Sequence, residues 1–202
     1  MIPAEDALQR LRDGNSRFLT GDVDQDSLCS GTRREQLREH QAPFAIIVGC
    51  SDSRVPVEVV FDQGLGDLFV IRVAGNIVSR TQLGSIEFAA GAFATRLVVV
   101  LGHTGCGAVD AALKSVQGGE LPESENLRLI VEQIRPAAER AIAAGQNGSD
   151  TELVDIIGRE NVRLAVDVIR NSPGIIRQLA EEEGLMVVGA EYSLETGAVE
   201  FF

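Results

Sequence analysis

Histidine is scarce in this sequence. Only His40 and His103 occur in 202 residues, together with three cysteines, one tyrosine and no tryptophan. A metal site with three imidazole ligands from one chain is thereby excluded. Three cysteines are also too few for a disulfide framework in a chain of this length, so we expect grouped thiols to serve a metal or catalysis in a reducing compartment.

Basic residues are in deficit as well. Lysine and arginine total 18 against 30 acidic residues, which gives a formal net charge of −12. Neutralising the phosphates of nucleic acid takes a basic face, so nucleic acid is not an expected partner. No apolar run approaches the roughly 20 residues that span a bilayer, and the amino terminus lacks the basic and apolar blocks of a secretory signal. We therefore expect a cytoplasmic protein without a membrane partner.

Short apolar runs alternate with helical patterns along the chain. Strands are predicted at residues 44–49, 68–73, 97–101 and 185–190, with a short last strand at 199–202. Helices are predicted at 4–19, 33–41, 55–61, 82–95, 106–117, 127–144, 151–169 and 172–183. We expect Gly14 and Asn15 to break the first helix, and Ser172 to cap the last one with Pro173 in its first position.

This alternation predicts the α/β class, with a central, mostly parallel sheet flanked by helices. We expect four parallel strands plus an antiparallel strand at the carboxyl terminus, which follows a tight turn. The length fits one domain over residues 1–202. Residues 1–40 are expected to form an N-terminal helical arm and residues 41–202 the α/β core.

Polar residues follow two of the predicted strands. Cys50-Ser-Asp52-Ser-Arg54 comes directly after residues 44–49, and His103-Thr-Gly-Cys106 comes after residues 97–101. If the two strands are parallel neighbours, their carboxyl ends lie together at the edge where open α/β sheets bind ligands. Two thiols and an imidazole that converge there suit a zinc ion with one coordination position open, which is the catalytic pattern.

The Asp52–Arg54 pair adds to this interpretation. Zinc lowers the pKa of bound water from about 15.7 toward 7, and a carboxylate fixed by a bidentate arginine can orient the resulting hydroxide toward an electrophile. Each residue alone has a simpler explanation, as a buried apolar cysteine, a turn residue or a core histidine. The CxDxR and HxxC patterns at the ends of two strands together favour the functional interpretation.

The two motifs resemble those of the β-class carbonic anhydrases. The likeness extends through residues 14–18, 66–70, 72–76, 84–88 and 192–197. It implies reversible hydration of carbon dioxide to bicarbonate and a proton, with Zn²⁺ as cofactor. Cys50, His103 and Cys106 would be the zinc ligands, and Asp52 and Arg54 the dyad that orients the zinc-bound hydroxide. The resemblance also implies a homodimer as the minimal unit, commonly paired into a homotetramer, with N-terminal helices wrapped around the partner and the active site near the interface.

Further residues match family positions around the substrate. Gln41 matches a glutamine that hydrogen-bonds substrate, Phe69 and Phe88 match aromatic residues of an apolar wall, and the backbone N–H of Gly107 matches a donor to a substrate oxygen. Core packing is an equal alternative for the two phenylalanines. His40 is the one other imidazole that could pass protons to buffer.

One branch of the family closes its site when the aspartate displaces water from zinc. Its bicarbonate pocket needs a tryptophan three residues before the first zinc cysteine, where this chain has Ile47. We therefore expect the open, water-ligated form at neutral or higher pH, with Asp52 able to act as a fourth ligand at lower pH. The sequence leaves two alternatives: a zinc lyase or hydrolase acting on carbon disulfide or carbonyl sulfide, and a non-catalytic zinc-stabilised binding or sensor domain. A thiol redox role is disfavoured because no CxxC is present.

Overall fold

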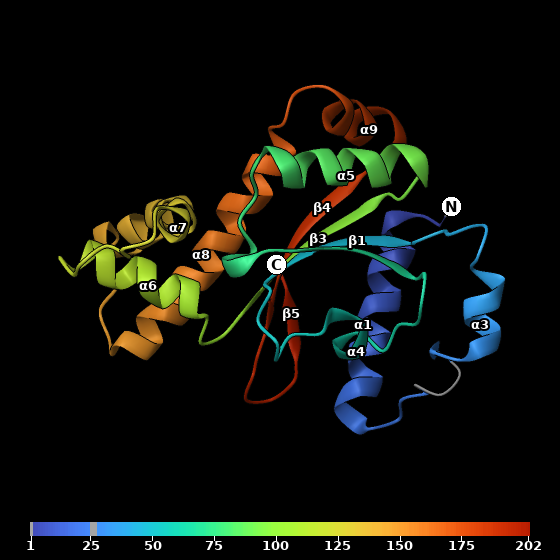
Figure 1. Cartoon of the computed structure of the whole chain (residues 1–202), viewed down its shortest axis with the longest axis horizontal. Helices are drawn as coiled ribbons and strands as arrows, with labels where there is room; N and C mark the ends of the chain where they lie inside the picture. The colour runs from blue at the N-terminus through green and yellow to red at the C-terminus, as the bar shows by residue number, and fades with distance from the viewer. Residues whose placement is uncertain (1, 25–27) are drawn as a thin grey trace.

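The computed structural model describes residues 2–24 and 28–202, and within them five strands form one mixed sheet (Figure 1). The strands are β1 (Ala45–Gly49), β2 (Leu68–Arg72), β3 (Leu97–His103), β4 (Met186–Tyr192) and β5 (Val199–Phe201). They lie in the order β2-β1-β3-β4-β5; the first four in this order are parallel, and β5 is antiparallel to β4. The predicted α/β class and strand arrangement are confirmed.

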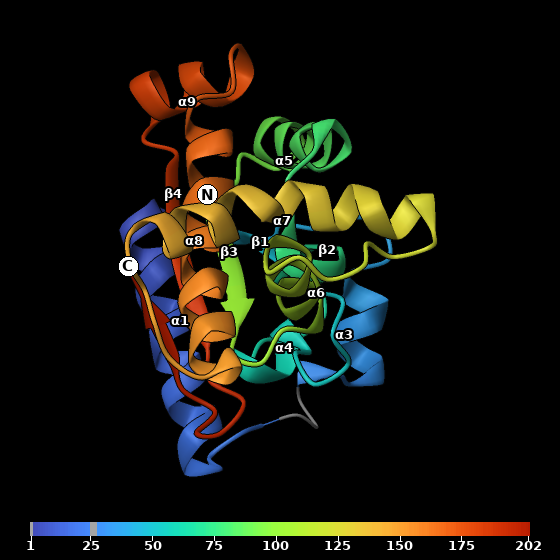
Figure 2. The same cartoon turned by 90° about the vertical axis from the view of Figure 1, so that its left-hand side faces the viewer.

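Helices cover both faces of the sheet. They are α1 (Ala4–Thr20), α3 (Gly31–Gln36), α4 (Val57–Val60), α5 (Arg80–Ala92), α6 (Gly107–Val116), α7 (Glu125–Ala143), α8 (Asp150–Arg170) and α9 (Ile175–Glu183), with a 3₁₀ turn, η1 (Ala74–Asn76). Helices α1 and α4 lie on one face and α5, α8 and α9 on the other, while α6 and α7 pack on α8 beyond the sheet (Figures 1 and 2). None of the helices in the described residues is long and apolar enough to span a bilayer.

The central strands are buried on both faces. In β1, Ile46 contacts the cluster under α5 and α8, whereas Ile47 contacts the cluster under α1 and α4. Strand β3 alternates in the same way and is buried along its whole length. A strand covered on both faces reads as a continuous apolar run, which is why β1 and β3 are visible in the sequence.

The register brings the carboxyl ends of three strands together. Gly49 at the end of β1 pairs with Arg72 of β2 and with Leu101 of β3. Cys50 therefore leaves the sheet beside the end of β3, where His103 is the last strand residue. The predicted convergence of the two motifs follows from this register.

The prediction that Gly14 and Asn15 break the first helix is wrong, since α1 runs unbroken to Thr20. A Cβ atom at Gly14 would lie 1.8 Å from the carbonyl oxygen of Phe61, so the glycine allows α1 to pass close to the end of α4. Asn15 donates to the carbonyl of Val60 over 3.1 Å and accepts from the N–H of Val199 over 2.9 Å. Both residues serve tertiary packing inside a regular helix.

The predicted start of the last helix is also wrong. Helix α9 begins at Ile175, and Gly174 with φ of 91° precedes it as the N-cap. Ser172 instead donates its N–H to the carbonyl of Ile169 over 3.1 Å, which closes the end of α8. The serine and the following proline therefore belong to the turn between the two helices.

Candidate metal centre

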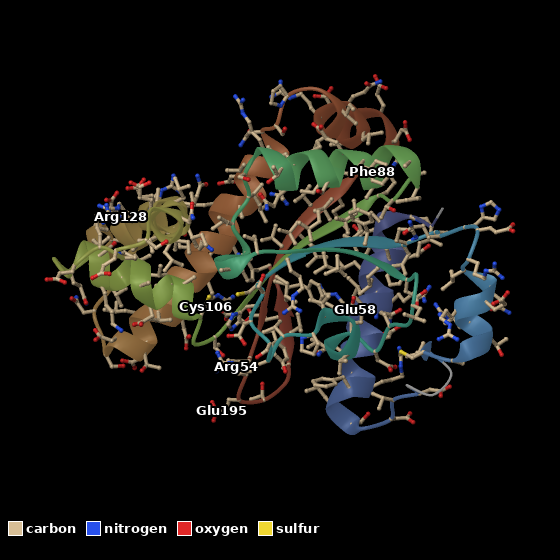
Figure 3. All side chains as sticks on the ribbon, in the orientation of Figure 1. Arg54, Glu58, Phe88, Cys106, Arg128 and Glu195 are labelled. Atoms are coloured by element: carbon tan, nitrogen blue, oxygen red, sulfur yellow. The ribbon has the colours of Figure 1, made fainter. Side chains whose placement is uncertain are left out.

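Three potential metal ligands meet at the carboxyl edge of the sheet. Cys50 follows β1, His103 ends β3, and Cys106, which is labelled in Figure 3, is the N-cap of α6. The two Sγ atoms and the ligand nitrogen of His103 all lie within 4.8 Å of one another, and all three residues are buried. Two sulfurs and one imidazole nitrogen in a buried group form a donor set that suits zinc.

His103 presents one ring nitrogen to this group. Its Nδ1 lies 2.9 Å from the carbonyl oxygen of Thr104 and, as the donor, fixes the neutral tautomer. Its Nε2 is buried and has no hydrogen-bond partner among the described residues. A buried polar atom without a partner is costly, and a metal ion among these donors would satisfy it. An oriented imidazole of this kind is typical of metal ligands.

The two thiols shift each other's pKa in opposite directions. The Cys106 thiol donates a hydrogen bond that lowers the pKa of Cys50 to about 4, against the opposing effect of burial. The pKa of Cys106 is raised, because the Cys50 thiolate accepts its proton and because the thiol is buried. Burial alone would lower the pKa of His103, but the negative charge of the nearby Cys50 thiolate raises it. A divalent cation would favour the deprotonated form of both sulfurs, and the two sulfurs and one imidazole nitrogen within 4.8 Å of one another fit a zinc ion.

Asp52 lies at the edge of this group and is held by Arg54. The guanidinium donates from Nε to Oδ1 over 2.9 Å and from Nη2 to Oδ2 over 2.7 Å, and the backbone N–H of Arg54 donates to Oδ1 over 2.9 Å. These bonds hold the pKa of Asp52 well below its usual range. Its Oδ2 is 3.9 Å from Nε2 of His103. The arrangement places an ionised, fixed carboxylate beside the three ligands.

Backbone anchors position the ligand-bearing turns. Arg72 donates from Nε to the carbonyl of Cys50 over 2.9 Å and from Nη2 to the carbonyl of Asp52 over 2.6 Å. On the other turn, the N–H of Gly105 donates to Asp155 of α8 over 2.8 Å. Sequence reasoning did not give either residue this role. Arg72 was visible as the one charge in an apolar strand, whereas Asp155 has no local signal.

The predicted substrate residues divide into two groups. Gly107 follows Cys106 and opens α6 at the metal ligands. Phe69 pairs with Ile46, four residues before Cys50 on the neighbouring strand, so it lies about 13 Å along the sheet from the cysteine. Phe88 contacts Phe69 with ring centroids 6.2 Å apart and lies on α5, well away from Cys106 and Arg54 (Figure 3). One chain therefore does not bring these rings to the ligands.

Gln41 and His40 are also remote from the ligands along the chain. Both are exposed and precede β1, whereas Cys50 follows that strand. Their side chains have no hydrogen bond to a ligand residue among the described residues. A substrate or proton-transfer role for either residue would require the site of another copy of the chain.

The sheet, the Cys-His-Cys donors and the Asp–Arg pair define an α/β protein with a candidate metal centre, whose donor set is of the catalytic type. The carbonic anhydrase family model matches residues 45–199. The chain is 39% identical over 194 residues to a carbonic anhydrase of Mycolicibacterium smegmatis, covering 96% of this chain and 91% of that protein. It is 38% identical over 191 residues to carbonic anhydrase 2 of Mycobacterium tuberculosis, covering 95% and 89%.

Solved structures agree. A structure from work on two tetrameric β-carbonic anhydrases of Sordaria macrospora matches with a TM-score of 0.76 and 27% identity, covering 84% of this chain and 85% of that chain. The Coccomyxa β-carbonic anhydrase in complex with acetazolamide matches with a TM-score of 0.73 and 28% identity, covering 85% and 77%. The chain belongs to the carbonic anhydrase family, in its β class. It is an enzyme of reversible carbon dioxide hydration, and the predicted family, activity and zinc cofactor are confirmed at the level of the family.

Proposed function

We propose that Cys50, His103 and Cys106 hold the zinc ion of this carbonic anhydrase and that Asp52 and Arg54 are its catalytic dyad. The observation that carries the proposal is the buried Nε2 of His103, which has no hydrogen-bond partner among the described residues and lies with two sulfurs within 4.8 Å and beside a fixed carboxylate. When bound, zinc supplies the Lewis acid that activates water for attack on carbon dioxide.

Asp52 orients the attacking water in this proposal. Its Oδ2 accepts a hydrogen bond from that water, while Arg54 keeps the carboxylate ionised and prevents it from rotating. The N–H of Gly107 is in the first turn of α6, where no intrahelical carbonyl accepts it. We assign it to hydrogen-bond an oxygen of the substrate, close to the ligand Cys106.

The open form of the site is the resting form in our proposal. Three hydrogen bonds from Arg54 engage both oxygens of Asp52. Moving this carboxylate onto the metal would require breaking the pair. We therefore assign the form with Asp52 as a fourth metal ligand to low pH, where protons disfavour a metal-bound hydroxide.

We propose a homodimer as the minimal unit, paired into a homotetramer. Strand β2 is an edge of the described sheet, its first three residues are only half-buried, and Phe88 beside it is 58% exposed. A large apolar ring at an uncovered strand edge supports a protein contact there. Contact with a partner would also explain how Gln41, Phe69 and Phe88 serve substrate: they would line the site of the other subunit.

The arrangement within the chain bears on this assembly. Helix α1 packs through Leu8 and Leu11 on the cluster that covers its own sheet. We propose that residues 1–202 act as one domain, with residues 1–40 as an arm that also reaches the partner. The three cysteines are free, and the two that we propose as metal ligands, Cys50 and Cys106, are buried. This supports a reducing compartment, and we propose the cytoplasm.

Metal content of single variants tests the ligand set. Cys50→Ser, His103→Ala and Cys106→Ser are each expected to lose zinc and carbon dioxide hydration together. Cys29→Ser is the matched control, because Cys29 is an exposed free cysteine outside the group, and it should retain both. A Cys106→Ser protein with full zinc content and wild-type turnover would contradict the assignment.

A further inference from the structure

Helix α8 reaches the turn that contacts the first metal ligand. Asn161 of α8 donates from Nδ2 to the carbonyl oxygen of Gly75, over 2.9 Å and in a buried environment. Gly75 lies in η1, and its own N–H donates to Sγ of Cys50 over 3.3 Å. Asn161 is therefore linked through a single residue, Gly75, to the Cys50 sulfur that we assign as a zinc ligand.

The η1 turn has little freedom to deviate from this geometry. Gly75 has φ of 69°, and a Cβ atom there would lie 2.6 Å from Cδ1 of Ile134 and 3.1 Å from Cβ of Ala108. The positive φ favours glycine at this point, and glycine alone does not fix the orientation of its peptide groups. The side-chain amide of Asn161, a residue that is 3% exposed, adds a constraint by holding the Gly75 carbonyl.

The hydrogen bond to sulfur has a chemical consequence for a bound metal. An N–H that donates to a thiolate withdraws electron density from the sulfur, so the sulfur donates less charge to the metal. Two thiolates otherwise make a zinc ion electron-rich and a weaker Lewis acid than an all-imidazole site would. Cys50 accepts from the N–H of Gly75 and, at 3.4 Å, from the N–H of Asp52.

We propose that Asn161 is a positioning residue of the metal centre: by anchoring Gly75, it maintains the N–H···S bond that sets how much charge Cys50 donates to the metal. The inference rests on the proposed ligand set. It assigns to α8 a role in the electronic properties of the metal that is separate from its packing in the core.

Cobalt-substituted protein provides a direct test, because the thiolate-to-cobalt charge-transfer band reports the charge on sulfur. Asn161→Leu keeps the branched shape and the number of heavy atoms of the side chain, although methyl groups make it larger, and it removes the donor. We expect its band to shift to lower energy than that of the wild type, since a sulfur without the N–H bond is more electron-rich. Val166→Ala is the matched control. Val166 is a buried residue of α8 in the main core cluster, so its replacement should lower the stability of the fold and leave the position of the charge-transfer band unchanged.

The outcomes separate the inference from the proposal on which it rests. If the wild-type protein with Co²⁺ shows no thiolate band, the proposed ligand set is wrong. If the wild type shows the band and folded Asn161→Leu protein keeps its position, the role of Asn161 is wrong. Should the leucine variant fail to fold, Asn161→Ser, which lets water reach the Gly75 carbonyl, takes its place with the same two outcomes.

Discussion

Replacing Asp52 by asparagine separates catalysis from metal binding. The variant keeps the size of the side chain and removes its charge. It also puts an NH₂ group in place of one carboxylate oxygen. If the NH₂ group takes the position of Oδ2, it faces Nη2 of Arg54, which in the wild type donates to Oδ2 over 2.7 Å. Two donors then oppose each other, and the side that faces His103 offers a donor to water where the wild type offers an acceptor.

The expected loss of turnover is large because both the charge and the orientation change. A positioned group of this kind typically contributes about 10²–10⁴-fold to a rate, which corresponds to about 2.7–5.5 kcal/mol of transition-state free energy. Zinc content should stay at about one ion per chain, because Asp52 is not in the group of three donors within 4.8 Å.

Stopped-flow hydration of carbon dioxide, with zinc determined on the same sample, measures both quantities. Glu58→Gln is the charge-matched control: it removes one carboxylate from α4, and Glu58 is exposed (Figure 3). We expect wild-type turnover from this control. Near-wild-type turnover of Asp52→Asn would refute the orienting role, and loss of zinc from it would make Asp52 a metal ligand instead.

Three further predictions concern packing, pH and the second ligand turn. Gly14→Ala should lower the free energy of unfolding by an amount at the upper end of the roughly 1–3 kcal/mol typical of overpacking, because the new Cβ would lie 1.8 Å from the Phe61 carbonyl oxygen. Gly31→Ala is the control, since a Cβ there meets no atom within 4 Å, and it should not destabilise the fold. Equal unfolding free energies of the two variants would contradict this prediction. Burial raises the pKa of Glu191 despite Arg159, so its stabilising contribution is present below the unfolded value of about 4.3 and is lost as pH rises through the folded value. Glu191→Gln should therefore gain thermal stability relative to wild type between pH 4 and 7, and a pH-independent difference would count against it. Asp155→Ala should weaken zinc binding about 10- to 100-fold. Asp155→Asn keeps an acceptor for the N–H of Gly105 and should keep most of the zinc affinity. If competition with a chelator showed the same loss of zinc affinity in both variants, Asp155 would not position the ligand turn through this hydrogen bond.

The convergence of Cys50, His103 and Cys106 could be predicted because local and global signals agree. Strands β1 and β3 are buried on both faces, so they appear as apolar runs that end in polar motifs. Parallel pairing then brings the motifs together without knowledge of the rest of the fold. The Asp52–Arg54 pair was predictable for the same reason, since two residues in one turn need no tertiary information to meet.

The helix boundaries that failed depended on distant partners. Gly14 follows a local rule for a helix break, but its neighbour is a carbonyl oxygen 47 residues further along the chain, at Phe61. Asn15 likewise bonds Val199 near the other end of the chain. Tertiary contacts of this range override local preference and leave no pattern in a single sequence.

The supporting residues of α8 were not predictable. Asp155 and Asn161 lie on an amphipathic helix, where scattered polar residues ordinarily face solvent. Their hydrogen bonds to Gly105 and Gly75 depend on how α8 crosses the sheet edge. The substrate role of Phe69 and Phe88 stays a prediction, because one chain places both rings away from the metal ligands.

The proposed zinc-dependent activity is tested by measuring carbon dioxide hydration by the wild-type protein across pH 6.5 to 9, with zinc determined in parallel. We expect about one zinc ion per chain and a rate that rises with pH through a pKa near or above 7. Full zinc content without turnover at any pH in this range would contradict it.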